Sequence, residues 1–394
     1  APQSRGRVRL SVRPVTPGEA VWTVEVQPEP EETDLENNRR SLRVPIRREL
    51  LRVLLADTLP RWEYRYLRNA LIRDPGTDVR CWLVHPHLGP GGGKDYLPAF
   101  PSSRDEISSY DVIILGDIGV GDGMLSAAQA QDIRGLVEHQ GGGLILIAGR
   151  QGHQASFVRS ELRDLLPVEF DPNHPAGTKT ATEGRFELTP DSREHPLVQL
   201  ADDAAANDLL WRSLPGFFWY ASVRSRPGSD VLAVHALARH EQGRVPLIVV
   251  RQAGLGRVLF MGTDAVWRWR RGVEDTYHYR FWGQVIRWMA HRRHMAHKAG
   301  LRWFTIPEQP RSGDRVRLQA ILDRDGVSNQ ALIEAEIVPP QGPLLRLMLA
   351  PIEPAWGLYE AVWTPTYPGT HRIKLRHAES GREVEGAIEI TEAA

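Results

Sequence analysis

The chain has 394 residues, enough for two or three domains, and its 49 basic residues (Lys and Arg) equal its 49 acidic residues (Asp and Glu). A formal charge of zero creates no overall field that would favour nucleic acid or an anionic membrane surface. No stretch approaches the ~20 consecutive apolar residues that span a bilayer, and residues 1–10 lack the apolar core of a signal peptide. One cysteine excludes an internal disulfide and a zinc site built on cysteines.

Residues 1–46 contain short stretches in which apolar and polar residues alternate, a pattern typical of strands with one buried face. These stretches are residues 8–12, 22–26 and, more weakly, 41–46. Three strands bury too little surface to form a stable sheet alone. We therefore expect a partial immunoglobulin-like β region, or strands that pack on the next domain.

In residues 47–299, short apolar runs alternate with segments of helical periodicity. Strands are predicted at 50–56, 78–84, 112–115 and 144–148, with helices at 61–72, 127–139 and 157–166. After residue 170 the pattern predicts antiparallel strands at 185–188, 217–223, 231–236, 245–250 and 257–261, then a helix over 277–296. This order predicts an α/β domain with a doubly wound, mainly parallel sheet and an antiparallel extension.

Residues 300–394 read as a second all-β region. Short alternating strands are predicted at 316–322, 331–338, 345–350, 357–363, 369–375 and 385–390. Six such strands in this length are typical of an immunoglobulin-like β-sandwich.

The stretch GGGLILIAGRQG, residues 141–152, resembles the strand-to-helix turn of the class I glutamine amidotransferase-like fold. The segments GLGRVLFMGTDAVWRWR (254–270) and FWGQVIRWMA (281–290) look like the end of that domain in large bacterial envelope proteins. The resemblance covers roughly residues 50–297 and implies a flavodoxin-like sheet.

The flanking regions carry resemblances of their own. The acidic turn at 31–38, which ends in Asn-Asn, is similar to a turn in CARDB-type adhesion modules, and residues 358–375 resemble the closing hairpin of envelope domains. Together these resemblances imply a segment of a bacterial cell-envelope protein outside the cytoplasm, periplasmic or on the cell surface. Its expected partners are other domains of the same larger protein or other envelope proteins.

Catalytic residues of the amidotransferase-like fold are missing at the matching positions. Active members place a cysteine at the strand-to-helix turn and a His–Glu pair after a later strand, whereas this chain has Gly149 and Arg150 at the turn and Asp264 and Trp267 after the late strand. Cys81 lies in the middle of a predicted strand, which is typical of a buried structural thiol. We therefore expect no catalytic residues and a non-catalytic interaction or scaffolding role, that of a pseudoenzyme.

Charged and aromatic residues nevertheless follow several predicted strands. In an α/β sheet, the carboxyl ends of neighbouring strands form the crevice in which ligands bind. We expect a crevice for a small polar ligand, lined by Asp57, Arg61, Trp62, Asp117, Gly149, Arg150, Asp264 and Trp267. The same residues are also compatible with a closed salt-bridge network, in which Arg150 offsets the acids and Asp57 or Asp264 caps a helix.

Two further alternatives stay open. One is an enzyme of the amidotransferase superfamily with a rearranged site that uses Cys81 or the acid pair Asp57 and Asp264. The other is a carbohydrate- or peptide-binding module in which Trp62 and Trp267 are stacking platforms.

No cofactor or metal is expected. The loop at 116–123 lacks the third glycine of a dinucleotide loop, and GPGGGK at 89–94 lacks the Walker spacing. His291, His294 and His297 follow one another at intervals of three, which rotates each by about 60° around a helix and suits a shared metal poorly.

Overall fold

The computed structural model describes residues 18–28, 38–46, 50–85, 89–90, 92–241, 243–294, 300–307, 309–322 and 332–392. The chain forms two compact units, residues 1–50 and 51–394. In the described part of the first unit, β1 (Gly18–Glu25) and β2 (Arg39–Ile46) form an antiparallel hairpin with Gly18 opposite Ile46. The strand predicted at 8–12 lies outside the described residues.

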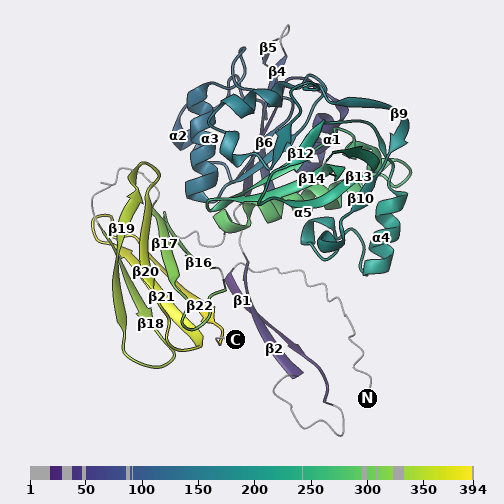
Figure 1. Ribbon diagram of the computed structural model, residues 1–394. Helices are drawn as coiled ribbons and strands as arrows, with labels where there is room; N and C mark the ends of the chain where they lie inside the picture. The colour runs from purple at the N-terminus through teal and green to yellow at the C-terminus, as the bar shows by residue number, and fades with distance from the viewer. Residues whose placement is uncertain are drawn as a thin grey trace. The chain divides into compact units, whose positions relative to one another are not determined.

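The second unit contains a nine-stranded sheet with the order β10-β13-β14-β15-β7-β6-β3-β4-β5 (Figure 1). Its strands are β3 (Leu51–Asp57), β4 (Thr77–His85), β5 (Gly89–Pro90), β6 (Val112–Leu115), β7 (Gly143–Ile147), β10 (Phe186–Leu188), β13 (Asp230–His240), β14 (Gly243–Ala253) and β15 (Gly256–Met261). Strands β4, β3, β6, β7 and β15 run parallel to one another, and the other pairings are antiparallel.

The predicted fold class was wrong. Strands hold 41% of the residues and helices 25%, and the large sheet is mixed rather than mainly parallel, so a doubly wound, flavodoxin-like domain does not describe it. The difference begins after β7, where a crossover helix was predicted at 157–166. The chain forms only two short 3-10 helices there, η2 (His153–Arg159) and η3 (Arg163–Leu165). Hairpins, which need no crossover helix, then add β13, β14 and β15 in antiparallel order.

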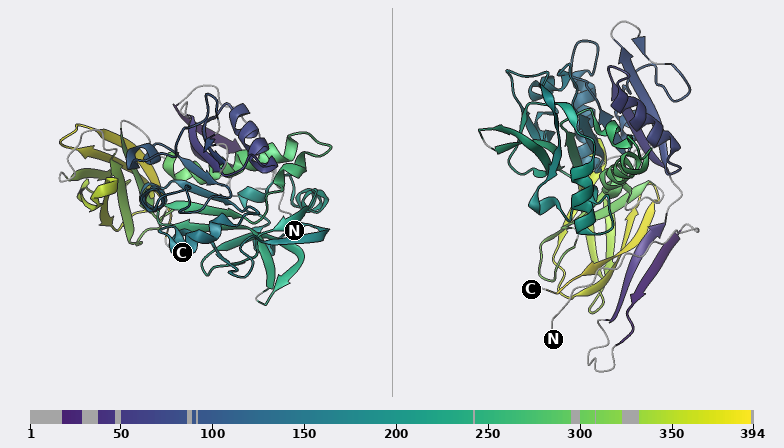
Figure 2. Two further views of the ribbon diagram at one scale, coloured as in Figure 1. Left: turned by 90° about the horizontal axis from the view of Figure 1, so that it is seen from above. Right: turned by 90° about the vertical axis from the view of Figure 1, so that its right-hand side faces the viewer.

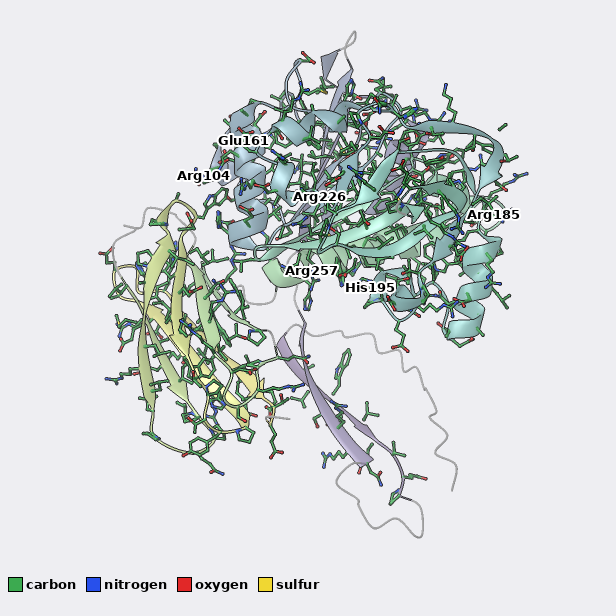
Figure 3. All side chains as sticks on the ribbon, viewed as in Figure 1. Arg104, Glu161, Arg185, His195, Arg226 and Arg257 are labelled. Carbon is green, nitrogen blue, oxygen red and sulfur yellow. The ribbon has the colours of Figure 1, made fainter. Side chains whose placement is uncertain are left out.

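Helices cover both faces of the nine-stranded sheet (Figure 2). They are α1 (Trp62–Arg73), α2 (Arg104–Ser108), α3 (Ala127–Gln140), α4 (Ala204–Ser213) and α5 (Thr276–His294). Successive residues of β3 point to opposite faces, so Leu55 belongs to one apolar cluster with residues of α1, α4 and α5, and Leu54 belongs to another with residues of α2 and α3. Side chains fill the space between the sheet and its helices (Figure 3). Both faces of the central strands are thus buried.

Two small antiparallel sheets extend this region. One pairs β8 (Val168–Phe170) with β12 (Val223–Ser225), and the other pairs β9 (Thr178–Gly184) with β11 (Phe217–Tyr220).

Among the described residues, no helix combines the length and the apolar composition needed to cross a membrane.

Residues 301–390 form a seven-stranded antiparallel sheet with the order β16-β17-β20-β19-β18-β21-β22. Its strands are β16 (Leu301–Ile306), β17 (Val316–Leu322), β18 (Ile333–Val338), β19 (Leu345–Glu353), β20 (Leu358–Trp363), β21 (Gly369–His377) and β22 (Glu383–Ile390). The sheet curls into a nearly closed barrel around its own apolar core.

The immunoglobulin-like sandwich predicted for residues 300–394 was therefore also wrong. A sandwich keeps two separate sheets face to face. Here β19 is long enough to pair with β18 through one end and with β20 through the other, which joins the strands into one continuous sheet. Alternation along each strand shows only that one face is buried, and both arrangements meet that condition.

Candidate functional site

A pocket of about 300 Å³ lies at the carboxyl ends of the parallel strands. Strands β3, β6, β7 and β15 are consecutive neighbours in the sheet, and the residues at or just after their ends line this pocket. The lining residues are Asp57, Thr58, Leu59, Arg61, Trp62, Asp117, Arg150, Gln151, Asp264 and Trp267. The structure thus brings seven of the eight residues of the predicted crevice together. The eighth, Gly149, lies behind the lining against Asp117.

Arg61 is the centre of the ionic network in the pocket. Its Nε donates to Asp57 Oδ2 at 2.8 Å, and Nη1 and Nη2 donate to the carbonyl oxygens of Ala148 (2.7 Å) and Ile147 (3.0 Å). Nη1 also lies 3.8 Å from Asp264 Oδ2. Every guanidinium nitrogen of Arg61 is therefore engaged, and this residue ties β3 to the end of β7. In the closed-network alternative, it is Arg150 that offsets the acids.

Asp57 is buried at the floor of the pocket. Its carboxylate accepts hydrogen bonds from the backbone N–H groups of Thr58 (2.8 Å) and Asp117 (3.3 Å) in addition to the bond from Arg61. Burial raises the pKa of the Asp57 carboxyl, and Arg61 opposes that rise only in part. No side chain caps the N-terminus of α1, so Asp57 does not cap this helix.

Asp117 organises the turn that follows β7. Its two carboxylate oxygens accept hydrogen bonds from the backbone N–H groups of Gln151 (2.7 Å) and His153 (3.0 Å). A Cβ atom on Gly149 would lie 2.3 Å from Asp117 Cβ, so no side chain fits at position 149. The turn after β7 is thus closely packed against an aspartate at the end of the neighbouring strand β6.

Arg150 is the most exposed ionised group of the pocket, because 54% of its side chain is open to solvent. Its Nε lies 3.5 Å from Asp264 Oδ2, and its guanidinium carbon lies 6.0 Å from the centroid of the Trp219 ring. The Arg150 side chain donates no hydrogen bond among the described residues, whereas Arg61 donates three. More than half of the Arg150 side chain is thus accessible to a ligand.

One wall of the pocket is aromatic. Trp62, the first residue of α1, is 54% exposed, and its ring centroid lies 5.8 Å from that of Trp267 in η6 (Val266–Arg270). Tyr66 stacks on both tryptophans, at 5.8 Å from Trp62 and 6.0 Å from Trp267. We call Trp62, Tyr66 and Trp267 the aromatic cluster. Sequence reasoning missed Tyr66, although its spacing of four residues from Trp62 places both on one side of α1.

A buried carboxylate behind the wall holds Trp267 in place. Glu63 Oε2 accepts a hydrogen bond from the backbone N–H of Trp267 at 2.8 Å. Its Oε1 accepts from Trp282 Nε1 at 3.1 Å and lies 3.4 Å from His278 Nε2. Glu63 thereby fastens η6 to α1 and α5. Nothing in the local sequence pattern distinguished this glutamate from a solvated one.

Cys81 does not line the pocket. It lies in β4 opposite Leu55 of β3 and is fully buried. Burial raises the pKa of its thiol, which disfavours the thiolate that nucleophilic catalysis requires. The alternative that relied on thiol chemistry therefore has no support in this geometry.

Metal-ligating side chains do not gather in the part of the chain that the structure describes. No group of three or more His, Cys, Asp or Glu side chains there could hold a metal ion. Of the histidine run, His297 lies outside the described residues.

No family model matches the chain, and no curated protein matches it in sequence. Among solved structures, it is similar to a cytoplasmic protein from Salmonella typhimurium, with 19% identity over 68% of this chain and 96% of that one (TM-score 0.42). It is also similar to an exo-β-1,4-mannosidase from Opitutaceae bacterium strain TAV5, with 13% identity over 61% of this chain and 36% of that one (TM-score 0.33).

A carbohydrate deacetylase matches with 12% identity over 76% of this chain and 38% of that one (TM-score 0.33). All three structures are under 20% identical to this chain and have TM-scores below 0.5. These similarities therefore identify neither a family nor an activity, and the functional argument rests on the pocket itself.

Proposed function

We propose that this chain binds a carbohydrate in the strand-end pocket and does not transform it. The observation that carries the proposal is that two aromatic rings, the exposed Trp62 and the half-buried Trp267, line one pocket together with charged groups. A sugar ring has apolar C–H faces that pack on aromatic rings and a rim of hydroxyl groups that hydrogen-bond to carboxylates and guanidinium groups. Both kinds of surface are present here, in a pocket large enough for one or two sugar rings.

The turn after β7 has no room for a catalytic side chain at position 149. The contact between Gly149 and Asp117 leaves no room for a nucleophile there, and the only thiol, that of Cys81, is buried outside the pocket. A pseudoenzyme of the amidotransferase-like group that presents a binding site in the bacterial envelope remains our interpretation of the sequence resemblance. Localisation outside the cytoplasm belongs to the same interpretation.

A second candidate is an enzyme that uses the pocket acids. The observation in its favour is the raised pKa of Asp57, because perturbed carboxyl groups are common at catalytic sites. Against it, the Asp57 carboxylate already accepts hydrogen bonds from Arg61 and two backbone N–H groups. A carboxyl group held in this way is poorly placed to reach a substrate.

The proposal is tested by titrating the full chain with soluble oligosaccharides in a calorimeter. We expect binding, and we expect Trp62→Ala to weaken it by about tenfold or more, because the lost stacking is worth roughly 1.4 kcal/mol. The matched control is Tyr367→Ala, which removes an aromatic side chain that is 40% exposed outside the pocket and is expected to change nothing.

Two results would contradict the proposal. If no oligosaccharide binds, or if Trp62→Ala binds as tightly as the unaltered chain, the pocket is not a carbohydrate site. If incubation releases new sugar products and Asp57→Asn abolishes their release, the enzyme alternative replaces the proposal.

A further inference from the structure

The charged groups of the pocket are exposed to very different degrees. The side chains of the three acids are almost covered, at 3% for Asp57, 5% for Asp117 and 11% for Asp264. Arg61 is 13% exposed, whereas Arg150 is 54% exposed. A ligand that enters from solvent therefore meets a guanidinium group before it meets any carboxylate.

The acids are also satisfied from within the protein. Asp57 is bonded to Arg61, and Asp117 is bonded to the backbone N–H groups of Gln151 and His153. Asp264 lies between two guanidinium groups, at 3.8 Å from Arg61 and 3.5 Å from Arg150. Each of the three carboxylates therefore has a hydrogen-bond or ion-pair partner within the protein.

Further guanidinium groups surround the aromatic cluster. Arg65 is exposed, its guanidinium lies 5.3 Å from the centroid of the Trp62 ring, and no ion pair to it occurs among the described residues. The guanidinium carbon of Arg268 lies 5.9 Å from the centroid of the Trp267 ring. Its buried Nε has no hydrogen-bond partner in the described part of the chain, and its Nη2 lies 3.7 Å from Glu183 Oε1. Sugar rings stacked on the cluster would therefore carry their substituents close to several cations.

The N-terminus of α1 also favours an anionic ligand. The helix begins at the pocket with Trp62, and no side chain caps its N-terminus. The unpaired N–H groups and the macrodipole at a helix N-terminus favour a negative charge nearby. By contrast, α2 and α3 each begin with a capping box formed by their own side chains.

From these contacts we infer that the carbohydrate bound in this pocket is acidic, with a carboxylate on the sugar ring, as in oligomers of hexuronic acid. The ring stacks on Trp62 and Trp267, and its carboxylate pairs with Arg150, while the carboxylates of neighbouring rings reach Arg65 and Arg268. This inference rests on the proposed carbohydrate-binding function and specifies its ligand class. Because the contributing arginine side chains are partly exposed, binding weakens as salt is added.

The test compares tetragalacturonate with its full methyl ester, which lacks the negative charges and carries a methyl group on each carboxyl, by calorimetric titration of the full chain. The acid is expected to bind about tenfold or more tightly than the ester, since a charge-assisted hydrogen bond adds roughly that factor. Arg150→Gln should abolish most of this preference, and Arg150→Lys, which keeps the charge, should retain part of it. The control Arg372→Gln, an exposed arginine of β21, should retain all of it.

The outcomes separate this inference from the proposed function. If the methyl ester or neutral oligosaccharides such as cellotetraose and mannotetraose bind as tightly as the acid, the acidic ligand class is wrong while carbohydrate binding stands. If the acid is preferred but Arg150→Gln keeps the preference, the assignment to this pocket is wrong. If none of these oligosaccharides binds, the inference and the proposed function fail together.

Discussion

The two large sheets of residues 51–394 treat buried charge differently. All four buried acids among the described residues, Asp57, Glu63, Asp74 and Asp117, belong to the region of the nine-stranded sheet. The seven-stranded sheet has an apolar core, and no acid of its described part is buried; Glu336, for example, is 35% exposed and pairs with Arg346, which is 66% exposed. Burying a carboxylate is costly unless it is paired and hydrogen-bonded. In the nine-stranded sheet, Asp57 and Asp117 are hydrogen-bonded at the carboxyl ends of the parallel strands, which is where the pocket lies.

This comparison shows how the same alternation of apolar residues can serve two purposes. In the seven-stranded sheet it builds a core with no buried acid among the described residues, although the side chain of Arg302 in β16 is buried. In the nine-stranded sheet, the apolar strands are also followed by charged residues, and these line one pocket together. Three variants or conditions test the comparison, in order of decreasing expected effect.

The largest effect is expected from Arg61→Gln. This change leaves the buried Asp57 without its cation, which destabilises a fold by about 3–5 kcal/mol when one partner of a buried pair is removed. The matched control is Arg346→Gln, whose guanidinium is 66% exposed and pairs with Glu336 at 3.0 Å. A surface pair of this kind contributes about 0–1 kcal/mol. Urea denaturation of the full chain measures the free energy of unfolding of each variant. If both variants lose the same free energy, the buried pair of the nine-stranded sheet contributes no more to stability than the surface pair of the seven-stranded sheet.

A smaller effect is expected from Gly149→Ala. The added methyl group would lie 2.3 Å from Asp117 Cβ, and displacing Asp117 should cost about 1–3 kcal/mol, as overpacking of a tight site typically does. Gly92→Ala is the control, because no heavy atom lies within 4 Å of a Cβ built there. The melting temperatures of the two variants are compared by circular dichroism. A melting temperature unchanged by Gly149→Ala would show that the turn after β7 is less constrained than the contacts indicate.

The smallest effect concerns pH and should be shared by both sheets. Burial lowers the pKa of His235 in β13 and of His377 in β21. His235 Nδ1 also accepts hydrogen bonds from the N–H groups of Leu237 (3.0 Å) and Ala238 (2.9 Å), and a proton on this nitrogen would break both. Because the folded pKa lies below the unfolded value of about 6.5, the stabilisation is complete above that pH and is lost as the pH falls toward the folded pKa.

The free energy of unfolding should change by at most about 1.4 kcal/mol per pH unit for each histidine. Urea denaturation between pH 7.5 and pH 5 measures this change in the unaltered chain and in His235→Gln. The variant should show a weaker dependence on pH below 6.5. An identical dependence in both proteins would mean that His235 titrates as it does in the unfolded chain.

Local patterns predicted much of the candidate site. The strands predicted at 50–56 and 112–115 are observed as β3 (Leu51–Asp57) and β6 (Val112–Leu115). An apolar run that is bounded by turn residues marks a buried strand and therefore also marks its end. The strand ends selected Asp57, Asp117, Arg150 and Asp264 as candidates, whereas the expectation that they are neighbours came from the family resemblance.

Contacts between distant segments were not predictable in the same way. Glu63 was missed because its partners, Trp267 and Trp282, are about 200 residues away in the chain. Arg61 was included in the crevice, but its role as the hub depends on the carbonyl groups of Ala148 and Ile147, which the backbone presents only after β7 has paired with its neighbours.

The sequence by itself thus determined the ends of several central strands and which charged and aromatic residues follow them, because side-chain periodicity and turn residues act over a few neighbouring positions. Only the tertiary structure decided how the strands pair, and so made one large sheet mixed and the other nearly closed. Pairing depends on hydrogen bonds and packing between segments that are far apart in the chain, and alternation within one strand is the same for several partners. For the same reason, only the tertiary structure decided that the acids of the pocket are covered and that Arg150 is exposed.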